Sequence, residues 1–510
     1  MKIFTHQQFR DIVERTIRDE GVTLLDLIEN AAEAIANEIM LRWRPSERLL
    51  VFAGWSDNGA EALGAARLLA QQGYNPEVYL FNIHNKITPE CRVCRDRLLA
   101  CQEQFKLFEI DGRERFSWPE FNKNCLIIDG LFGSDLQEQL PVPFQLLIGN
   151  INNSGAEVVS IDVPSGMFSE WNQGVSLSHK VHATLTLALG VPRLAFFIAD
   201  NAEAVGEWRV LDIGLSVRAI REAPYSYYLV QNNTVRQFLP ARNPNCCKAD
   251  FGNTLICAGS EGMMGAAVLA ACGALRSGSG KVTVHSARCG LDILQTAVPS
   301  AMFHCDNSNR YITAFPTDNS QWSAIGVGPG IGTAEATIDA LEHFLKTRSA
   351  MSAPVVLDAD ALNCMALRPI LLDYLPVLSV LTPHAGEFDR LFGAQPSHEA
   401  RLRKAIEVAH FHRVIIVLKG RFTAIVRPDG KIFFNSSGSP AMSTGGSGDV
   451  LTGIITGLMA QGYKPEKATF IGCYIHGVAG EIACARNGEY GTTSGDIADC
   501  IGRAIMQIQA

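Results

Sequence analysis

Short apolar segments typical of strands alternate with helical segments along most of the chain, and the alternation restarts once. In the first half the strand candidates are residues 49–53, 77–81, 126–129, 158–162, 184–189 and 208–216. In the second half they are residues 254–259, 281–286, 323–328, 355–360, 378–383, 413–420 and 422–427. Strands that alternate with helices imply a parallel sheet covered on both faces. The sequence therefore predicts two α/β domains.

The stretch at residues 238–252 separates the two series of strands. It holds two prolines and two asparagines and has few periodic apolar positions. A chain of 510 residues is also too long for one ordinary hydrophobic core. We place the boundary a little before this stretch, so the predicted domains are residues 1–218 and 219–510.

Composition narrows the class of protein. The chain is 47% hydrophobic and 19% charged, with a net charge of -8, which fits a globular protein and lacks the basic footprint of a nucleic-acid binder. The first residues turn polar quickly, unlike a secretory signal. The longest apolar run, residues 263–275, is too short to span a bilayer. We expect neither nucleic-acid nor membrane partners.

The 14 cysteines follow no repeating spacing, which fits a reducing compartment and a cytoplasmic location. One CxxC pair is present, Cys91 and Cys94. A zinc site would need a second such pair or a suitably spaced pair of histidines, and neither is found. The pair is therefore interpreted as two thiols on one helix face.

Glycine and polar residues gather where the strands of the second half are expected to end. They lie at residues 328–332, 357–363, 382–387, 418–420 and 444–449. In open parallel sheets, ligands bind at the carboxyl ends of strands. Successive polar strand ends therefore predict one shared crevice.

The segment TGGSGD, residues 444–449, is the sharpest signal in this crevice. Its glycines allow backbone N–H groups to approach a phosphate, and a helix that begins near Asp449 would add its positive dipole end. A carboxylate there could accept the proton of a hydroxyl that attacks phosphorus. The alternative is that Asp449 only caps the helix. No Walker A sequence is present, and the GxGxxG spacing in residues 326–332 lacks the ribose-binding acid of a dinucleotide fold.

Seven stretches of the second half, taken in order, resemble the ribokinase-like ADP-dependent NAD(P)H-hydrate dehydratases. They are residues 248–252, 259–284, 326–332, 355–363, 381–393, 414–420 and 443–462. The resemblance covers nearly all of residues 235–510. The first half resembles the NAD(P)H-hydrate epimerases, which are commonly fused in front of the dehydratases. The chain is thus similar to a bifunctional enzyme that repairs nicotinamide nucleotides.

The resemblance implies a reaction and a set of residues for the second half. ADP phosphorylates the hydroxyl of hydrated NADH or NADPH, phosphate leaves, and the reduced dinucleotide, AMP and phosphate result. Asp449 corresponds to the base. The residues implied for ADP or AMP are Lys419, Gly420, Arg421, Phe422, Thr423, Gly445, Gly446 and Gly448. Those implied for the hydrated dinucleotide are Ala267, Gly330 and His384, with Asn363 and Glu387 for Mg²⁺ or phosphate.

The first half departs from the epimerase loop, which is close to GxGNNGGDGxxxAR. Asn58 and Gly59 are kept, but Asp57, Ala60, Glu61 and Ala62 replace Asn, Gly, Asp and Gly. Alanine resists positive φ and adds a methyl group. Glu61 keeps a carboxylate but moves it about one methylene, enough to matter for catalysis. We expect impaired epimerisation, although Asp57 or Glu61 could compensate for the lost acid.

Two further loops of the first half resemble the epimerases. Residues 127–136 resemble DALxGTGL, and residues 160–167 match DxPSG. The resemblance implies contacts to the hydrated dinucleotide from Asp57, Asn58, Gly59, Ala60, Glu61, Gly133, Ser134, Asp135 and Asp162. It also implies a K⁺ ion held among Asn58, Asp129, Asp162 and Ser165. The alternative is that Asp129 and Asp162 only cap turns or helices.

Two other functions stay open on the sequence alone. The second half could be an ATP-dependent kinase of a small hydroxymethyl compound, since the phosphate loop would serve either reaction. The first half could be a binding or assembly domain without turnover. Relatives are often multimers, so a homo-oligomer is expected.

Overall fold

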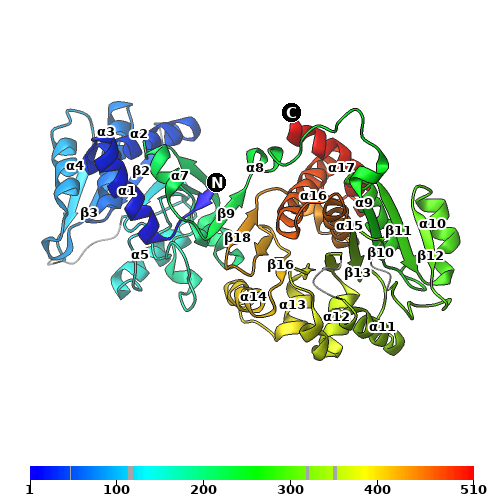
Figure 1. Cartoon of the computed structure of the whole chain (residues 1–510). Helices are drawn as coiled ribbons and strands as arrows, with labels where there is room; N and C mark the ends of the chain where they lie inside the picture. The colour runs from blue at the N-terminus through cyan, green and yellow to red at the C-terminus, as the bar shows by residue number, and fades with distance from the viewer. Residues whose placement is uncertain (46, 113–118, 317–320, 349–352) are drawn as a thin grey trace. The chain divides into compact units, whose positions relative to one another are not determined.

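The computed structural model describes residues 1–45, 47–112, 119–316, 321–348 and 353–510. It divides into two compact units, residues 2–226 and residues 227–510, with Met1 counted in the second. Each unit contains a largely parallel sheet with helices on both faces (Figure 1). The expectation of two α/β domains is confirmed.

The division falls between Ser226 and Tyr227, later than the predicted boundary after residue 218. Helix α7 (Val217–Glu222) belongs to the first unit because Ala219 and the following Ala223 are buried in its core. Lys2 Nζ also donates hydrogen bonds to the carbonyls of Ile220, Arg221 and Ala223, at 3.2, 2.6 and 2.7 Å. These contacts tie α7 to the first unit.

The sheet of the first unit is parallel throughout and has the strand order β4-β3-β2-β5-β6-β7-β8. Its strands are β2 (Arg48–Ala53), β3 (Pro76–Phe81), β4 (Lys106–Ile110), β5 (Cys125–Gly130), β6 (Glu157–Ile161), β7 (Leu185–Leu189) and β8 (Glu207–Leu211). A short strand β1 (Lys2–Ile3) precedes them. The chain builds outward from β2 in one direction and from β5 in the other. The topological switch point, where such sheets bind ligands, therefore lies between β2 and β5.

Successive side chains of β2 point alternately into the two hydrophobic cores of the first unit. Leu49 and Val51 pack with the helices on one face, and Leu50 and Phe52 pack with α5 on the other. The first face is covered by α1 (His6–Glu20), α2 (Leu24–Arg42), α3 (Asp57–Gln71) and α4 (Pro89–Leu99), and the second by α5 (Val142–Asn153). Burying each such side chain contributes about 1.5–3 kcal/mol. Helix α6 (Ala202–Val205) completes the unit.

The cysteines behave as the sequence predicts. Cys91 and Cys94 lie one turn apart on α4 and are buried in the core. All 14 cysteines, each within the described part of the chain, are free. Burial raises the pKa of the Cys91 thiol to about 12 and that of Cys94 to about 11. The interpretation of this pair as two thiols on one helix face is confirmed.

The sheet of the second unit runs in the order β9-β18-β17-β16-β15-β14-β13-β10-β11-β12. Its strands are β9 (Tyr227–Val230), β10 (Asn253–Cys257), β11 (Lys281–Ser286), β12 (Met302–Cys305), β13 (Ala324–Val327), β14 (Val355–Leu357), β15 (Val380–Leu381), β16 (Ile415–Leu418), β17 (Ala424–Val426) and β18 (Ile432–Asn435). The prediction of a parallel sheet is wrong at β17, which pairs antiparallel with both neighbours. A hairpin turn through Gly430, at φ 81°, reverses the chain between β17 and β18.

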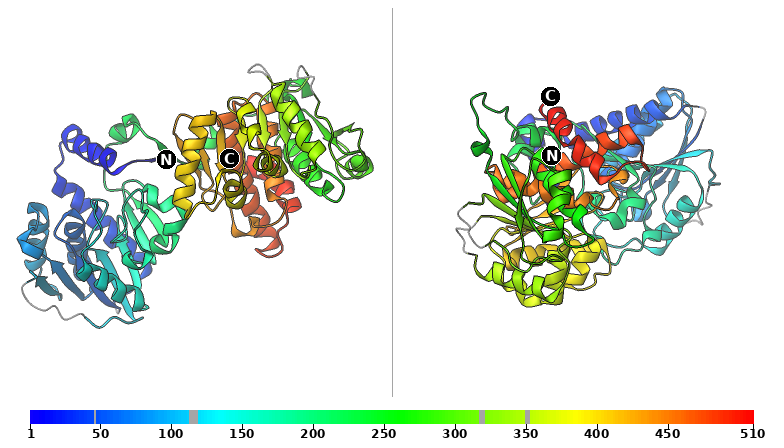
Figure 2. Two further views of the ribbon diagram at one scale, coloured as in Figure 1. Left: turned by 90° about the horizontal axis from the view of Figure 1, so that it is seen from below. Right: turned by 90° about the vertical axis from the view of Figure 1, so that its right-hand side faces the viewer.

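Helices cover both faces of this sheet (Figures 1 and 2). One face carries α9 (Met264–Arg276), α15 (Ser447–Ala460), α16 (Pro465–Asn487) and α17 (Ser494–Gln509), and the other α11 (Glu335–Lys346), α12 (Asp360–Leu367), α13 (Ala385–Phe392) and α14 (His398–His412). Helices α8 (Asn232–Arg236) and α10 (Leu291–Ala297) are peripheral. Within the described residues α16 alone is long and apolar enough to cross a membrane, but 78% of its apolar window is buried, as expected for a core helix.

Glycines allow α9 and α15 to pack backbone against backbone. A Cβ on Gly273 would lie 2.4 Å from the Val450 carbonyl oxygen, and one on Gly453 would lie 2.0 Å from that of Ala270. Both distances are far below van der Waals contact, so larger residues would force the helices apart. The N-terminus of α15 is thereby fixed against α9.

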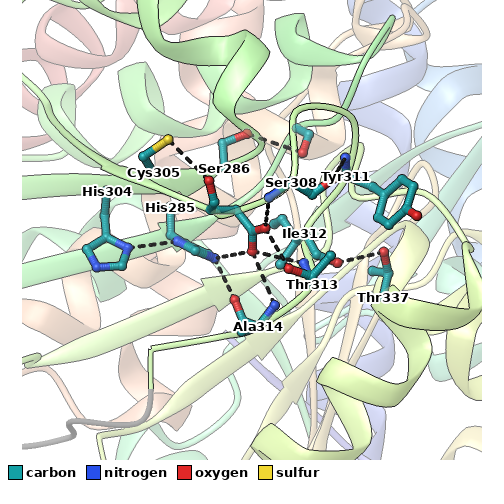
Figure 3. A network of polar contacts seen from close by, with 12 residues as sticks. His285, Ser286, His304, Cys305, Ser308, Tyr311, Ile312, Thr313, Ala314 and Thr337 are labelled. Atoms are coloured by element: carbon teal, nitrogen blue, oxygen red, sulfur yellow. Dashed lines mark hydrogen bonds and ion pairs between the residues drawn. The ribbon is translucent and has the colours of Figure 1, made fainter.

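A polar network fixes the segment that follows β12 (Figure 3). His285 Nε2 lies 2.7 Å from the Ala314 carbonyl, which can only accept, so Nε2 carries the proton. His285 Nδ1 therefore accepts from His304 Nδ1, at 2.9 Å. Asp306 accepts hydrogen bonds from the backbone N–H groups of Ser308 and Thr313, at 2.8 and 2.9 Å. Burial lowers the pKa of His285, so this network is structural and contains a neutral imidazole.

Candidate active sites

The glycine-rich segment before α15 forms an open helix N-terminus. Gly446 adopts φ 87°, and a Cβ there would lie 2.4 Å from Leu269 Cδ1. Among the described residues no side chain caps α15. Its first N–H groups and the helix dipole therefore suit an anion. This is the geometry that the sequence predicts for a phosphate site at Gly445, Gly446 and Gly448.

Asp449 lies in the first turn of α15 and is half-buried. In the part of the chain that the structure describes, its carboxylate has no hydrogen-bond or ion-pair partner. Burial and, next, Asp358 raise the pKa of Asp449, Lys419 opposes the rise, and the resulting pKa is about 7. An unpaired carboxylate with a pKa near neutrality can take up and release a proton.

A partly buried ion pair, in which Asp358 is buried and Lys419 is partly exposed, lies beside this carboxylate. Lys419 Nζ, at the end of β16, donates to Asp358 Oδ1 at 2.9 Å, and Thr452 Oγ1 of α15 donates to Asp358 Oδ2 at 2.7 Å. Lys419 Nζ also lies 3.9 Å from Glu387 Oε2. Burial opposes the charge of Lys419, but Asp358 and Glu387 outweigh it, and the net effect raises the pKa of Lys419. The lysine therefore holds a fixed positive charge near the open helix terminus.

Gly448 leaves room for that charge. A Cβ on Gly448 would lie 3.1 Å from Lys419 Nζ and 3.6 Å from Asp358 Oδ2. The side chain of any other residue would thus intrude between the loop and the ion pair. This supports the prediction that Gly448 contacts the nucleotide, since its backbone can approach both a phosphate and the ammonium group.

The turn after β14 is strained. Ala359 adopts φ 50° and ψ -117°, which residues other than glycine rarely do. It lies between Asp358, paired with Lys419, and Asp360, whose Oδ2 accepts the Gly332 N–H at 2.9 Å. Asn363 donates to Asp360 Oδ1 at 3.0 Å and accepts from Arg390. The amide of Asn363 is therefore engaged within the protein.

His384 and Glu387 cap α13. His384 Nδ1 accepts the N–H groups of Gly386 and Glu387, at 3.0 and 3.3 Å, so the imidazole carries its proton on Nε2 when neutral. Glu387 Oε2 accepts the His384 backbone N–H at 2.8 Å. The His384 side chain is 57% exposed. It is accessible to a ligand, as the resemblance implies, and the capping box fixes its orientation.

The other residues implied for the ligands differ in access. Ala267 is fully buried in α9, so its methyl group packs in the core. Gly330 adopts φ 63° in a tight turn, where a Cβ would lie 2.7 Å from the Met263 carbonyl oxygen. The loop between β16 and β17 contains Gly420, Arg421, Phe422 and Thr423, with Thr423 Oγ1 donating to the Gly420 carbonyl at 3.1 Å.

Four residues at this site are missed by motif matching: Asp358, Asp360, Thr452 and His476. The acids could have been found because DAD directly follows a strand. His476 gives no sequence signal, since it lies in the middle of α16. Its Nε2 is 3.3 Å from Ser447 Oγ, and burial lowers the pKa of His476 to about 4. A neutral imidazole thus supports the first residue of α15.

The first unit has a cavity of about 170 Å³ at its topological switch point. It brings together seven of the residues that the sequence implies for the hydrated dinucleotide: Asp57, Asn58, Glu61, Gly133, Ser134, Asp135 and Asp162. Gly59 and Ala60 do not line it. They are buried in α3, and a Cβ on Gly59 would lie 1.9 Å from the Gly54 carbonyl oxygen. The altered loop therefore still encloses a site.

Burial raises the pKa values of two acidic residues in this cavity. Burial raises the pKa of Glu61 well above its ordinary value, and Asp162 and Asp57 raise it further. Burial therefore favours the neutral form of Glu61. Burial, followed by Asp135, raises the pKa of Asp57 to about 6. Asp162, at φ 61°, accepts from Arg193 Nη2 at 2.7 Å.

The residues implied for K⁺ fit such an ion in part. Among the described residues, Asn58 Oδ1 is buried without a hydrogen-bond partner and could serve as a ligand. Asp129 already accepts from Ser165 Oγ and Ser160 Oγ, at 2.6 and 2.8 Å. Asp162 is committed to Arg193. Among the described residues, this cavity included, no group of three or more His, Cys, Asp or Glu side chains is suited to a metal ion.

Ala62, which replaces a glycine of the altered loop, faces Gly130 of β5 where α3 packs on the sheet. A Cβ on Gly130 would lie only 2.5 Å from Ala62 Cβ. In the loops that the first half resembles, the residue at position 62 is Gly and the residue at position 130 is Ala. In this chain the methyl group is on α3 and position 130 has none, so only one methyl group lies between the helix and the strand at this point.

Two family models match the chain. One, described as NAD(P)H-hydrate dehydratase, matches residues 254–503, and one described as YjeF-related protein N-terminus matches residues 24–195. The chain is similar to the bifunctional NAD(P)H-hydrate repair enzyme Nnr of Moorella thermoacetica, with 31% identity over 95% of this chain and 92% of that protein. It is also 30% identical to the enzyme of that name from Coxiella burnetii, over 97% of each chain.

A solved structure is similar to the second unit. The ADP/ATP-dependent NAD(P)H-hydrate dehydratase from Bacillus subtilis, co-crystallised with ATP and Mg²⁺, has 31% sequence identity to this chain. The match covers 55% of this chain and 98% of that protein, with a TM-score of 0.48.

The pair of Ala62 and Gly130 generates a stability prediction. Gly130→Ala alone should destabilise the first unit by about 1–3 kcal/mol, because overpacking a core costs that much. Adding Ala62→Gly should recover most of this loss. Chemical denaturation of the two single variants and the double variant measures the coupling. Additive effects of the two substitutions would contradict the account of a shared methyl position.

Proposed function

Because the chain belongs to the family of bifunctional NAD(P)H-hydrate repair enzymes, we propose roles for its two sites in the repair of nicotinamide nucleotides. The second unit dehydrates hydrated NADH and NADPH at the expense of ADP. The first unit retains an epimerase-like cavity with impaired epimerase activity. The observation that carries the first role is the unpaired Asp449 carboxylate beside Lys419 at an open helix N-terminus.

We assign to Asp449 the removal of the proton from the hydroxyl of the hydrated ring. The hydroxyl oxygen then attacks the terminal phosphorus of ADP, and AMP leaves. The phosphorylated ring next loses phosphate with the electrons of the C–O bond, and loss of a proton from the neighbouring carbon restores the double bond. For the phosphoryl transfer, it suffices to position the hydroxyl near the phosphorus and to neutralise the charge of the phosphates. The N-terminus of α15 and Lys419 supply both.

Mg²⁺ bound to the nucleotide phosphates would neutralise part of their charge. Of the residues implied for it, Glu387 lies near Lys419 and caps α13, and Asn363 is held by Asp360 and Arg390. Both are therefore assigned to shaping the site around the phosphates. His384 Nε2 and the turn at Gly330 are assigned to the hydrated dinucleotide.

The rival function, an ATP-dependent kinase of a small hydroxymethyl compound, is not favoured. The whole-length similarity to repair enzymes includes the first unit, which a small-molecule kinase does not need. Product analysis separates the two. A kinase would leave a stable phosphate ester, whereas the proposed reaction yields AMP, phosphate and reduced dinucleotide.

The impairment of the first site is proposed from its charges. Glu61, whose pKa burial raises, and the side chains of Asp57 and Asp135 occupy a cavity where the resembled loops have Asp, Asn and Gly. If K⁺ binds there, Asn58 Oδ1 is its open ligand, beside Asp129 and Ser165. We further propose a cytoplasmic location, which the free cysteines support, and assembly into a homo-oligomer.

The role of Asp449 predicts that Asp449→Asn lowers the dehydration rate by at least about 10³-fold, because the amide cannot accept the proton. ADP affinity should change little. Single-turnover kinetics and equilibrium ADP binding measure the two effects. Asp292→Asn, at an exposed position of α10, is the matched control and should keep wild-type turnover. Turnover near the wild-type rate in Asp449→Asn would remove this residue as the base.

The pKa of Asp449 predicts a pH profile. The base works only when deprotonated, so kcat/KM should fall as the pH drops below about 7. Lys419 lowers this pKa, so Lys419→Met should move the ascending limb to higher pH. A pH titration of kcat/KM for both proteins checks this. An unchanged limb in Lys419→Met would show that another group controls it.

The altered loop predicts a gain of function. Asp57→Asn combined with Glu61→Asp should raise the epimerisation rate, because these changes remove one charge and draw the other carboxylate back by one methylene. Chromatographic separation of the two hydrate epimers over time measures the rate. Asp96→Asn, 57% exposed on α4, serves as the charge control. No gain in the double variant, together with fast wild-type epimerisation, would mean that the natural loop is competent.

A further inference from the structure

The second unit has a large cavity at the end of α15 that lies away from Asp449. Its volume is about 1130 Å³, comparable to the largest small-molecule pockets, of roughly 1,000 Å³. One wall is the segment that leads from α8 to β10, residues 238–251, which we call the arm. The other walls are the C-terminal ends of α9 and α15 and one side of α17. The repair reaction proposed above assigns no role to this cavity.

A guanidinium group is held in place at this cavity. Arg242 of the arm stacks over the Phe251 ring at 3.7 Å, and its Nη2 donates to the Gly278 carbonyl at 2.5 Å. Gly278 adopts φ 103°, and a Cβ there would lie 2.3 Å from this Nη2, so glycine permits the close approach. Among the described residues Arg242 has no carboxylate partner. Its positive charge is thus fixed without an opposite charge.

The helix ends in the wall are covered by side chains. Helix C-termini carry a partial negative charge, which would oppose an anion. Gln461 Nε2 donates to the carbonyls of Ser277 and Gly457, at 3.1 and 2.9 Å, and Arg242 covers the Gly278 carbonyl. The partial charges of both helix ends are therefore compensated, and the charged side chains determine which ligand the cavity attracts.

The charged residues in the lining are Arg242, Arg276 and Asp250. Asp250 Oδ2 accepts the Cys247 N–H at 2.7 Å, so this carboxylate is engaged within the arm. Arg276 pairs with Asp499 at 2.6 Å, and the two side chains are 46% and 59% exposed. Because exposed ion pairs contribute little stability, Arg276 can turn to a ligand at small cost. The lining thus favours an anion.

Aromatic side chains give the cavity flat walls. Phe238, Phe251 and Tyr463 line it. The Tyr463 hydroxyl donates to the Phe238 carbonyl at 2.8 Å, and the Phe238 ring packs edge-on against Phe470 at 5.7 Å. These rings are therefore held in place, and aromatic bases stack well on such rings. A ligand with both a ring and a negative charge suits this lining.

We propose that the cavity between the arm and the ends of α9 and α15 binds an anion that carries an aromatic ring and has the size of a nucleoside monophosphate. Arg242 binds the anionic group through the N–H groups that do not face Gly278, Arg276 joins it, and the aromatic residues hold the ring. Since α15 has 14 residues, this site lies about 21 Å from the glycine-rich segment that precedes the helix. It is a site separate from the one that holds ADP.

Equilibrium dialysis of the full chain with AMP, which has one base and one phosphate, counts the sites. The wild-type protein should bind two AMP molecules per chain, one beside Asp449 and one in the cavity. Arg242→Gln should weaken binding at one site by at least about tenfold, because charge-assisted hydrogen bonds to the phosphate are lost. Arg503→Gln, exposed on α17 outside the lining, removes the same charge and should keep both sites.

Competition separates the role of the charge from that of the ring. Adenosine has the base without phosphate, and ribose 5-phosphate has phosphate without the base. Each should displace AMP from the site that depends on Arg242 at least about tenfold less well than AMP itself. Displacement by either compound as strong as that by AMP would overturn the proposal.

Unchanged AMP binding at both sites in Arg242→Gln would also overturn it. Arg276→Gln should weaken the same site by a smaller factor. If Arg242→Gln does not fold, unchanged AMP binding in Arg276→Gln overturns the proposal instead.

Dehydratase assays on the same preparations keep this test separate from the proposed function. Dehydration of NADH hydrate by a chain without an AMP site that depends on Arg242 would overturn only the inference about the cavity. Such a site in a chain that does not dehydrate the hydrate would support the inference and overturn only the function assigned to the second unit.

Discussion

The partly buried ion pair between Lys419 and Asp358 is the constraint on which the second unit's chemistry depends. It joins the ends of β14 and β16 to α15 through Thr452. Breaking a buried pair by removing one partner typically costs about 3–5 kcal/mol, because the other charge is left uncompensated. The site therefore needs both residues, and Gly448 must lack a side chain for the ammonium to stand beside the loop. Burial first, and Asp358 second, raise the pKa of Asp449, whereas Lys419 lowers it.

The packing of α9 against α15 fixes the helix that carries Asp449 and Thr452. Gly273 and Gly453 let the two helices meet at backbone contact, so the N-terminus of α15 has a fixed place over the sheet. The neutral His476 adds a contact to Ser447. The strained Ala359 turns the chain so that Asp358 and Asp360 face different partners. A site that depends on a proton acceptor gains from such rigidity, because misplacement of a catalytic group is costly.

Sequence patterns predict the strands at the centre of both sheets and the glycine loop, because apolar runs and glycine spacing are local signals. They miss β4, β9, β12 and β18, which are short or partly exposed. They also miss the pair of Lys419 and Asp358, which are 61 residues apart and meet only through the order of β14 and β16. They also miss the contact between positions 62 and 130. Each of these two residues, compared alone with the loops that the first half resembles, suggests a loss of function. The cavity of the first unit persists although its charges differ from those of the loops it resembles.

The most direct measurement of the central claim follows the return of reduced-nicotinamide absorbance from a mixture of both hydrate epimers, with ADP, Mg²⁺ and K⁺. Spontaneous epimerisation, measured by chromatography under the same conditions without protein, is the background. The account predicts fast recovery of one epimer, followed by a slow phase at the background rate. Complete fast recovery would contradict the impairment of the first site. No recovery with ADP would contradict the assignment of the second unit as the dehydratase.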